Sequence, residues 1–191
     1  MFTALLDTSV LWPSTQRDFL LSLAVEGLYR PVWSSAILDE LEYHESIKLQ
    51  ERGVPRDEAE ARAARLIQRM TVFSDAEVTG WEPLEGTFGL PDPDDEHVAA
   101  AAALAGAGAI VTSNLKDFPA DRLPDSLQVL PPHEFAANTV SLDPSRAALA
   151  VTTMATRSGR LGPKRSPTDL LDILEHRYTM GTAAALIRPL L

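Results

Sequence analysis

The chain has 191 residues, of which 45% are hydrophobic and 23% are charged, and this is the composition of an ordinary globular protein. It contains no cysteine, so disulfides, thiolate nucleophiles and sulfur-bound zinc are excluded. The formal net charge of −10 argues against a broad basic face for nucleic acid. No apolar run reaches membrane-spanning length and the first residues lack a basic signal-peptide region, so we expect a cytoplasmic protein with no membrane partner.

The charge is unevenly distributed along the chain. Residues 1–142 carry 10 basic and 23 acidic side chains, whereas residues 143–191 carry 7 basic and 4 acidic ones. Four of the basic residues of the second segment lie close together: Arg157, Arg160, Lys164 and Arg165. Two interpretations stay open, a basic appendage on an acidic body and a solvated loop that carries several charges.

Strands and helices are expected to alternate through the first 135 residues. Apolar runs predict strands at residues 3–6, 30–33, 71–73, 109–112 and 128–130. Amphipathic spacing, capping residues and helix-starting prolines predict helices at residues 16–25, 36–49, 55–70 and 93–105, and a short one from 132. This alternation predicts an α/β fold with a parallel sheet and helices on both faces.

The pattern changes after about residue 138. Helices are expected at residues 143–154, from 166 onward and at 181–187, with a basic loop between the first two. We therefore expect two units, residues 1–138 and a helical C-terminal extension at residues 139–191.

Carboxylates gather where such folds bind their ligands, at the carboxyl ends of the strands. Asp7 directly follows the first expected strand, and Asp117 lies in the polar stretch after the fourth. A second group, Asp92, Asp94 and Asp95, opens an alanine-rich helix. Clustered carboxylates repel and raise one another's pKa, so Mg²⁺ or Mn²⁺ is their natural partner. The pattern predicts a metal-dependent hydrolase.

Each of these features also has a purely structural interpretation. Asp7 can begin a turn, and Asp92 fits a helix N-cap with Pro93 behind it. Glu40 lies within an acidic stretch, residues 39–45, from which spacing does not single it out. The four histidines are scattered without the spacing of a zinc hydrolase, and the three tryptophans are interpreted as core or lid packing.

Four segments in order, residues 5–11, 35–41, 92–101 and 110–119, resemble the PIN-domain nucleases, and among them the VapC-type toxins of bacterial toxin–antitoxin pairs. The resemblance covers about residues 1–135. It implies a three-layer α/β/α fold with a central, mostly parallel sheet. Residues 139–191 look like an accessory helical region of some members, and no role is transferred to them.

The resemblance implies four catalytic acids: Asp7, Glu40, Asp95 and Asp117. It selects Glu40 from its acidic neighbours because Leu41 follows it, and Asp95 because the small-residue helix begins in step with it. Asp92 stays open as a fifth participant. Asn114 stands where some members carry another acid.

The resemblance also implies a role for each acid. Asp7, Asp95 and Asp117 are the implied ligands of Mg²⁺ or Mn²⁺. Glu40 is the implied residue that positions or deprotonates the attacking water. Three hydroxyl residues are expected to hydrogen-bond the ligands or the phosphate: Thr8, Thr112 and Ser113.

The activity implied by this resemblance is metal-dependent hydrolysis of RNA phosphodiester bonds by an endoribonuclease toxin. Its implied partners are a small cognate antitoxin protein and a second copy of the chain in a homodimer. Three alternatives stay open: a structure-specific DNA nuclease, a non-catalytic PIN-like module that binds RNA or protein, and a receiver-like phosphoacceptor domain. The last expects paired acids after the first strand, where this chain has one.

Overall fold

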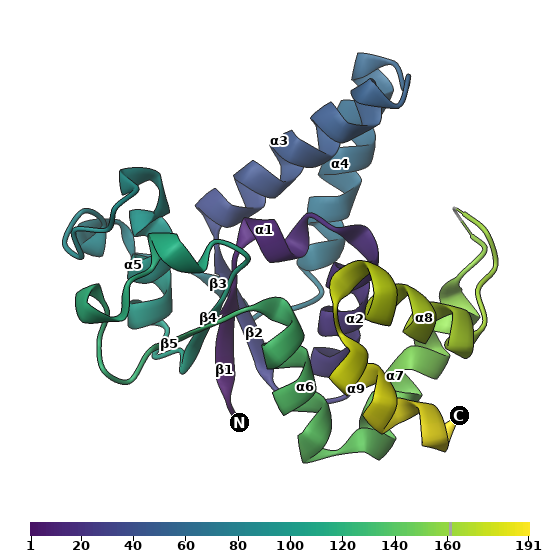
Figure 1. Ribbon diagram of the computed structural model, residues 1–191. Coiled ribbons are helices and arrows are strands. Elements are labelled where there is room, and N and C mark those ends of the chain that lie inside the picture. The colour runs from purple at the N-terminus through teal and green to yellow at the C-terminus, as the bar shows by residue number, and fades with distance from the viewer. Residues whose placement is uncertain (161) are drawn as a thin grey trace.

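A five-stranded parallel sheet forms the centre of the computed structural model, which describes residues 1–160 and 162–191 (Figure 1). The strands are β1 (Thr3–Leu6), β2 (Arg30–Ser34), β3 (Glu77–Val78), β4 (Ala109–Val111) and β5 (Gln128–Leu130). Their order is β3-β2-β1-β4-β5, and every pairing is parallel. The chain moves outward on one side of β1 and then returns to the other side. The crevice at the carboxyl ends of β1 and β4 is therefore the point where such a fold binds its ligand.

Helices cover both faces of this sheet, as the sequence predicts (Figure 1). In the PIN-like part, α5 lies on one side of the strands, while α2 and α6 lie on the other. The bounds are α1 (Thr8–Leu11), α2 (Ser14–Val25), α3 (Ser35–Glu51), α4 (Arg56–Met70), α5 (Glu96–Leu104) and α6 (Pro132–Leu142). Short 3₁₀ turns are η1 (Glu82–Leu84), η2 (Pro93–Asp95), η3 (Leu115–Asp117) and η4 (Ala120–Arg122). The predicted three-layer α/β/α architecture is confirmed.

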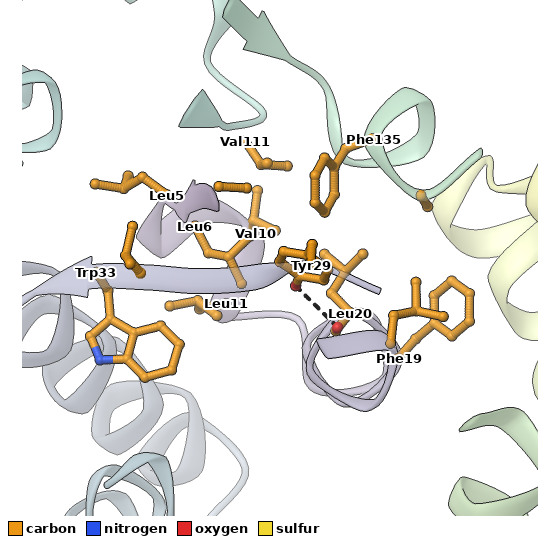
Figure 2. Packing of buried hydrophobic residues seen from close by; sticks show 14 of the residues in the cluster. Leu5, Leu6, Val10, Leu11, Phe19, Leu20, Tyr29, Trp33, Val111 and Phe135 are labelled. Carbon is orange, nitrogen blue, oxygen red and sulfur yellow. Dashed lines mark hydrogen bonds between the residues drawn. The ribbon is translucent and has the colours of Figure 1, made fainter. Parts of the chain in front are cut away.

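The core is built from strands that are apolar on both faces, because helices cover both. Leu5, Leu6 and Val111 are completely buried (Figure 2). Beside them, the ring of Tyr29 meets Phe135 edge-on, with ring centroids 4.8 Å apart. The Tyr29 hydroxyl donates to a backbone carbonyl of α2 at 3.0 Å, which satisfies the one polar atom that this ring buries (Figure 2).

The C-terminal segment forms α7 (Pro144–Arg157), α8 (Pro167–Tyr178), α9 (Gly181–Ile187) and the turn η5 (Arg188–Leu190). Asp143 caps α7, and Ser166 with Asp169 forms the expected capping box of α8. These helices pack against α2 and α6, so one buried apolar cluster includes residues from both segments. The division into residues 1–138 and 139–191 stays a prediction.

One expected strand lies in the wrong place. Residues 71–73 form a turn, in which the amides of Val72 and Phe73 bond back to the last turn of α4, and Val72 is 79% exposed. The strand that pairs with β2 is Glu77–Val78. The β-branched pair Thr71 and Val72 favours a strand locally, but the chain must first turn out of α4 before it can reach the sheet edge.

Among the residues that the structure describes, no helix combines the length and apolarity needed to cross a membrane.

Candidate active site

Asp7 lies in the crevice, at the junction between β1 and α1. Its carboxylate is 5% exposed and accepts hydrogen bonds from Ser9 at 2.6 Å and Thr112 at 2.7 Å. The Asp7 amide donates to Val111, which ties the end of β1 to the end of β4. Within residues 1–160 and 162–191, no lysine or arginine pairs with Asp7. A buried carboxylate whose side-chain partners are two hydroxyls is a fitting ligand for a cation.

Asp95 stands at the end of η2, where α5 begins. Burial and the negative charges of Asp7, Asp92 and Asp117 together raise its pKa from the ordinary 3.8 to about 6. The structure therefore places Asp95 within electrostatic reach of the other two predicted metal ligands, Asp7 and Asp117. Asp92 adds its charge to this group while its side chain accepts from the Asp94 amide at 3.0 Å.

The position of Asp95 depends on the small residues of α5. Residues 99–102 are four completely buried alanines, and the helix contacts β1, β2 and β4. Small side chains allow this close approach, which holds the acidic first turn beside the strand ends. Glu96 is also buried, and its carboxylate accepts from the amides of Phe88 and Leu90 at 3.1 and 2.7 Å. Glu96 therefore fixes the preceding loop rather than joining the site.

Glu40, in the second turn of α3, contacts two side chains that lie close in the sequence to other predicted site acids: Thr8 follows Asp7, and His97 lies two residues after Asp95. Thr8 donates to one carboxylate oxygen at 2.6 Å, and the His97 Nε2 lies 3.1 Å from the other. Burial opposes the charge of Glu40, but the hydrogen bonds from His97 and Thr8 outweigh it and lower the pKa. Burial likewise opposes the charge of His97, and its bond to Glu40 outweighs that effect and raises the pKa. The two side chains form an ion pair that orients Glu40.

His97 is a site residue that the sequence analysis missed. Its ring lies between Glu40, the Ser34 hydroxyl at 3.5 Å and the Trp81 ring at 5.9 Å. The only local signal is its place two residues after Asp95 at the start of a buried helix.

The tryptophans and the predicted hydroxyl residues differ in how they match expectation. Trp33 and Trp81 are buried as expected, whereas Trp12 is 41% exposed and so is not part of the core. Thr8 and Thr112 bind the carboxylates of Glu40 and Asp7. Ser113 reaches the site through its amide, which donates to Ser9.

The donor set fits a hard divalent cation. Among the described residues, no three acidic or histidine side chains already stand in the arrangement of a metal centre. The available donors are nonetheless carboxylate oxygens, which Mg²⁺ and Mn²⁺ prefer, and their mutual repulsion already shows in the raised pKa of Asp95. Asp7, Asp95 and Asp117 would hold the ion.

The fold and the acidic crevice define the class of protein, an α/β protein with carboxylates at the carboxyl ends of its parallel strands. A family model described as PIN domain matches residues 3–116, more than half of the chain, so the chain belongs to the PIN-domain family. PIN domains are typically metal-dependent nucleases, which supports a nuclease-type function. The match includes Asp7, Glu40 and Asp95 and ends one residue before Asp117. Comparisons with curated proteins and with solved structures find no match.

Proposed function

We propose that this protein is a Mg²⁺- or Mn²⁺-dependent endoribonuclease. The observation that carries the proposal is the raised pKa of Asp95, to which the negative charges of Asp7 and Asp117 contribute, in a chain of the PIN-domain family. Among the described residues no lysine or arginine forms an ion pair with these three acids, so they are suited to a divalent cation, and a divalent cation at an acidic edge suits phosphodiester hydrolysis.

The residues of the crevice divide the work of hydrolysis. Asp7, Asp95 and Asp117 hold the metal ion, which supplies positive charge to the phosphate oxygens when bound. Glu40, oriented by Thr8 and His97, positions the attacking water and accepts its proton. The water oxygen forms a bond to phosphorus as the bond to the leaving oxygen breaks, and the leaving oxygen takes up a proton. The lowered pKa of Glu40 keeps this carboxylate ionised and ready to orient water.

The proposed biological role is that of a toxin, neutralised by a small antitoxin protein and acting as a cytoplasmic homodimer. The support for this part is the resemblance of the four segments, residues 5–11, 35–41, 92–101 and 110–119, to VapC-type toxins. Expression in bacteria tests it: the wild-type chain is expected to stop growth, and Asp7→Asn is expected to be harmless at equal protein level. Equal toxicity of the two would contradict the catalytic basis of the role.

The nuclease proposal is tested by incubating the purified chain with total cellular RNA, and separately with a matched RNA and DNA pair, in Mg²⁺, Mn²⁺ or EDTA. Asp95→Asn is the test variant and Asp94→Asn the matched control, because the exposed Asp94 carries the same charge one position away. We expect discrete RNA fragments with metal for the wild type and the control, and none for Asp95→Asn or in EDTA. Cleavage of DNA alone would assign the site to DNA, and intact RNA and DNA in every lane from folded protein would reject a nuclease.

A further inference from the structure

A large cleft lies away from the carboxylates and is formed largely by the C-terminal segment. It has a volume of about 1360 Å³. One wall comes from α2 and the end of α4, and the other from α7, α8 and their connection. These helices lie side by side in the structure, where α7 and α8 pack against α2 (Figure 1). The family model ends at residue 116, so it does not account for the second wall.

The cleft is basic although the chain is acidic. Its lining contains six arginines and one histidine against three aspartates, in a chain of net charge −10. All three aspartates already have partners: Asp18 pairs with Arg157 at 2.8 Å, Asp172 pairs with Arg188 at 3.0 Å, and Asp169 accepts a backbone amide at the start of α8. The negative charges of Asp18 and Asp172 are therefore each compensated by an arginine.

The positive charges of the arginines are paired less completely than the negative charges of the aspartates. Arg17 is buried, and its guanidinium donates to the Leu11 carbonyl at 2.6 Å, so it acts as a structural residue. Lys164, near the cleft, is likewise engaged by the last carbonyls of α7. Four exposed arginines of the lining form no ion pair with any described residue: Arg69, Arg160, Arg165 and Arg177.

The lining of the cleft also contains apolar side chains. Its lining includes Leu21 of α2, Met70 at the end of α4, Phe73, Met154 of α7 and Ile173 of α8. Exposed guanidinium groups match the geometry of phosphate oxygens, and apolar or aromatic side chains accept the faces of unstacked bases. A cleft with both features suits a single strand of nucleic acid, whose phosphates and bases alternate along its length.

Two residues that line the cleft lie close to Asp7 in the amino-acid sequence. Ser14 and Thr15, at the start of α2, line the cleft, and Asp7 precedes them by seven residues. Even a fully extended chain of seven residues spans at most roughly 25 Å, and α1 shortens that path. Arg17 strengthens the connection, because it binds the last carbonyl of α1 from within the cleft.

We propose that this cleft holds the phosphate backbone of single-stranded RNA beyond the bond that the carboxylate edge cuts. The proposal rests on the proposed endoribonuclease function. Residues 1–142 carry thirteen more acidic than basic side chains, so the body of the protein repels a polyanion. The arginines contributed by residues 143–191 supply the compensating attraction, which assigns a function to the C-terminal extension.

The test is the binding of a fluorescently labelled single-stranded RNA of about 20 nucleotides to the full chain in EDTA, followed by anisotropy over a range of salt concentrations. The test variant is Arg160→Glu with Arg165→Glu. The matched control is Arg52→Glu with Arg65→Glu, an equal change of charge at exposed positions outside the cleft. We expect at least tenfold weaker binding for the cleft variant and less than twofold for the control. Loss of two phosphate contacts should also reduce the slope of log affinity against log salt by about 1.4.

Melting temperatures verify that both double variants fold, and Arg160→Gln with Arg165→Gln replaces the first if it does not. Equal affinity of the wild type and the cleft variant would overturn the proposal, as would equal losses in the cleft and control variants. Binding of a polyglutamate peptide in the cleft in place of RNA would also overturn it. Because EDTA prevents cleavage, this result is independent of the nuclease assay. RNA binding through the cleft without any cleavage in Mn²⁺ would support the cleft and reject the nuclease.

Discussion

Replacing Asp95 by asparagine is expected to stabilise the metal-free protein at neutral pH. Burial and the neighbouring carboxylates raise the pKa of Asp95 from 3.8 to about 6, so the ionised form is disfavoured in the folded chain. At about 1.4 kcal/mol per pH unit, this corresponds to roughly 3 kcal/mol. Because Asp95 is only partly buried, solvent screening reduces the expected gain to about 1 kcal/mol. A chain of this size should then melt about 2–4 °C higher.

The pH dependence of this gain follows from the direction of the pKa shift. A carboxyl whose pKa is higher in the folded than in the unfolded chain stabilises the fold fully below about pH 4, and that contribution is lost as the pH rises through about 6. Asparagine carries no charge at any pH. The advantage of Asp95→Asn should therefore be absent near pH 4 and complete at pH 7.5.

The assay is thermal unfolding followed by circular dichroism in EDTA, from pH 4.5 to 8, with Asp94→Asn as the control. The control is expected to melt like the wild type at every pH. Addition of Mn²⁺ at pH 7.5 should reverse the order, because the wild type then gains binding energy that Asp95→Asn lacks. An unchanged or lower melting temperature of Asp95→Asn at pH 7.5, or the same gain at pH 4.5, would refute the reasoning about the carboxylate cluster.

Three further substitutions test other parts of the site. Glu40→Gln should lower the cleavage rate by about 10²- to 10⁴-fold and leave Mn²⁺ affinity unchanged, because the residue accepts a proton rather than holding the ion; a matching loss of Mn²⁺ binding would make it a ligand instead. His97→Gln should lower the free energy of unfolding by about 1 kcal/mol, most strongly between pH 4.5 and 6.5. Above this range His97 loses its proton as the pH passes its raised pKa, and below it Glu40 gains one as the pH passes its lowered pKa, so the ion pair weakens on both sides. Denaturant titrations that give a pH-independent loss would contradict this. Thr112→Val should cost about 2 kcal/mol in urea unfolding, because the buried hydroxyl donates to a carboxylate, whereas Ser113→Ala at the exposed neighbour should cost nothing measurable.

Most of the fold could be predicted because local and tertiary preferences agree. The strands that became β1, β4 and β5 are short apolar runs bounded by turn residues, and the caps at Ser34, Asp143 and Ser166 mark helix starts that the structure retains. The third strand could not be placed. Residues 71–73, which include the β-branched pair Thr71 and Val72, follow the end of α4, where the chain turns. The short pairing segment Glu77–Val78 has little strand character of its own.

The carboxylate cluster was predictable for a different reason. The carboxyl ends of parallel strands meet at one edge, so Asp7 and Asp117, which follow two of the expected strands, were both expected at that edge. Glu40 could not be chosen by spacing, since α3 carries acids at several neighbouring positions. The family resemblance selects Glu40 through Leu41, and in the structure its tertiary contacts with Thr8 and His97 distinguish it. The contact of His97 with Glu40 is also tertiary, so in the sequence His97 is one of four scattered histidines.

The most direct test of the central claim is the stoichiometry of Mn²⁺ binding, measured by electron paramagnetic resonance on the metal-free chain. We expect one or two ions per chain for the wild type and for Asp94→Asn, with binding lost or strongly weakened in Asp7→Asn and Asp95→Asn. Equal binding by all four proteins, or no binding by the folded wild type, would contradict the assignment of the crevice as the metal centre of a nuclease.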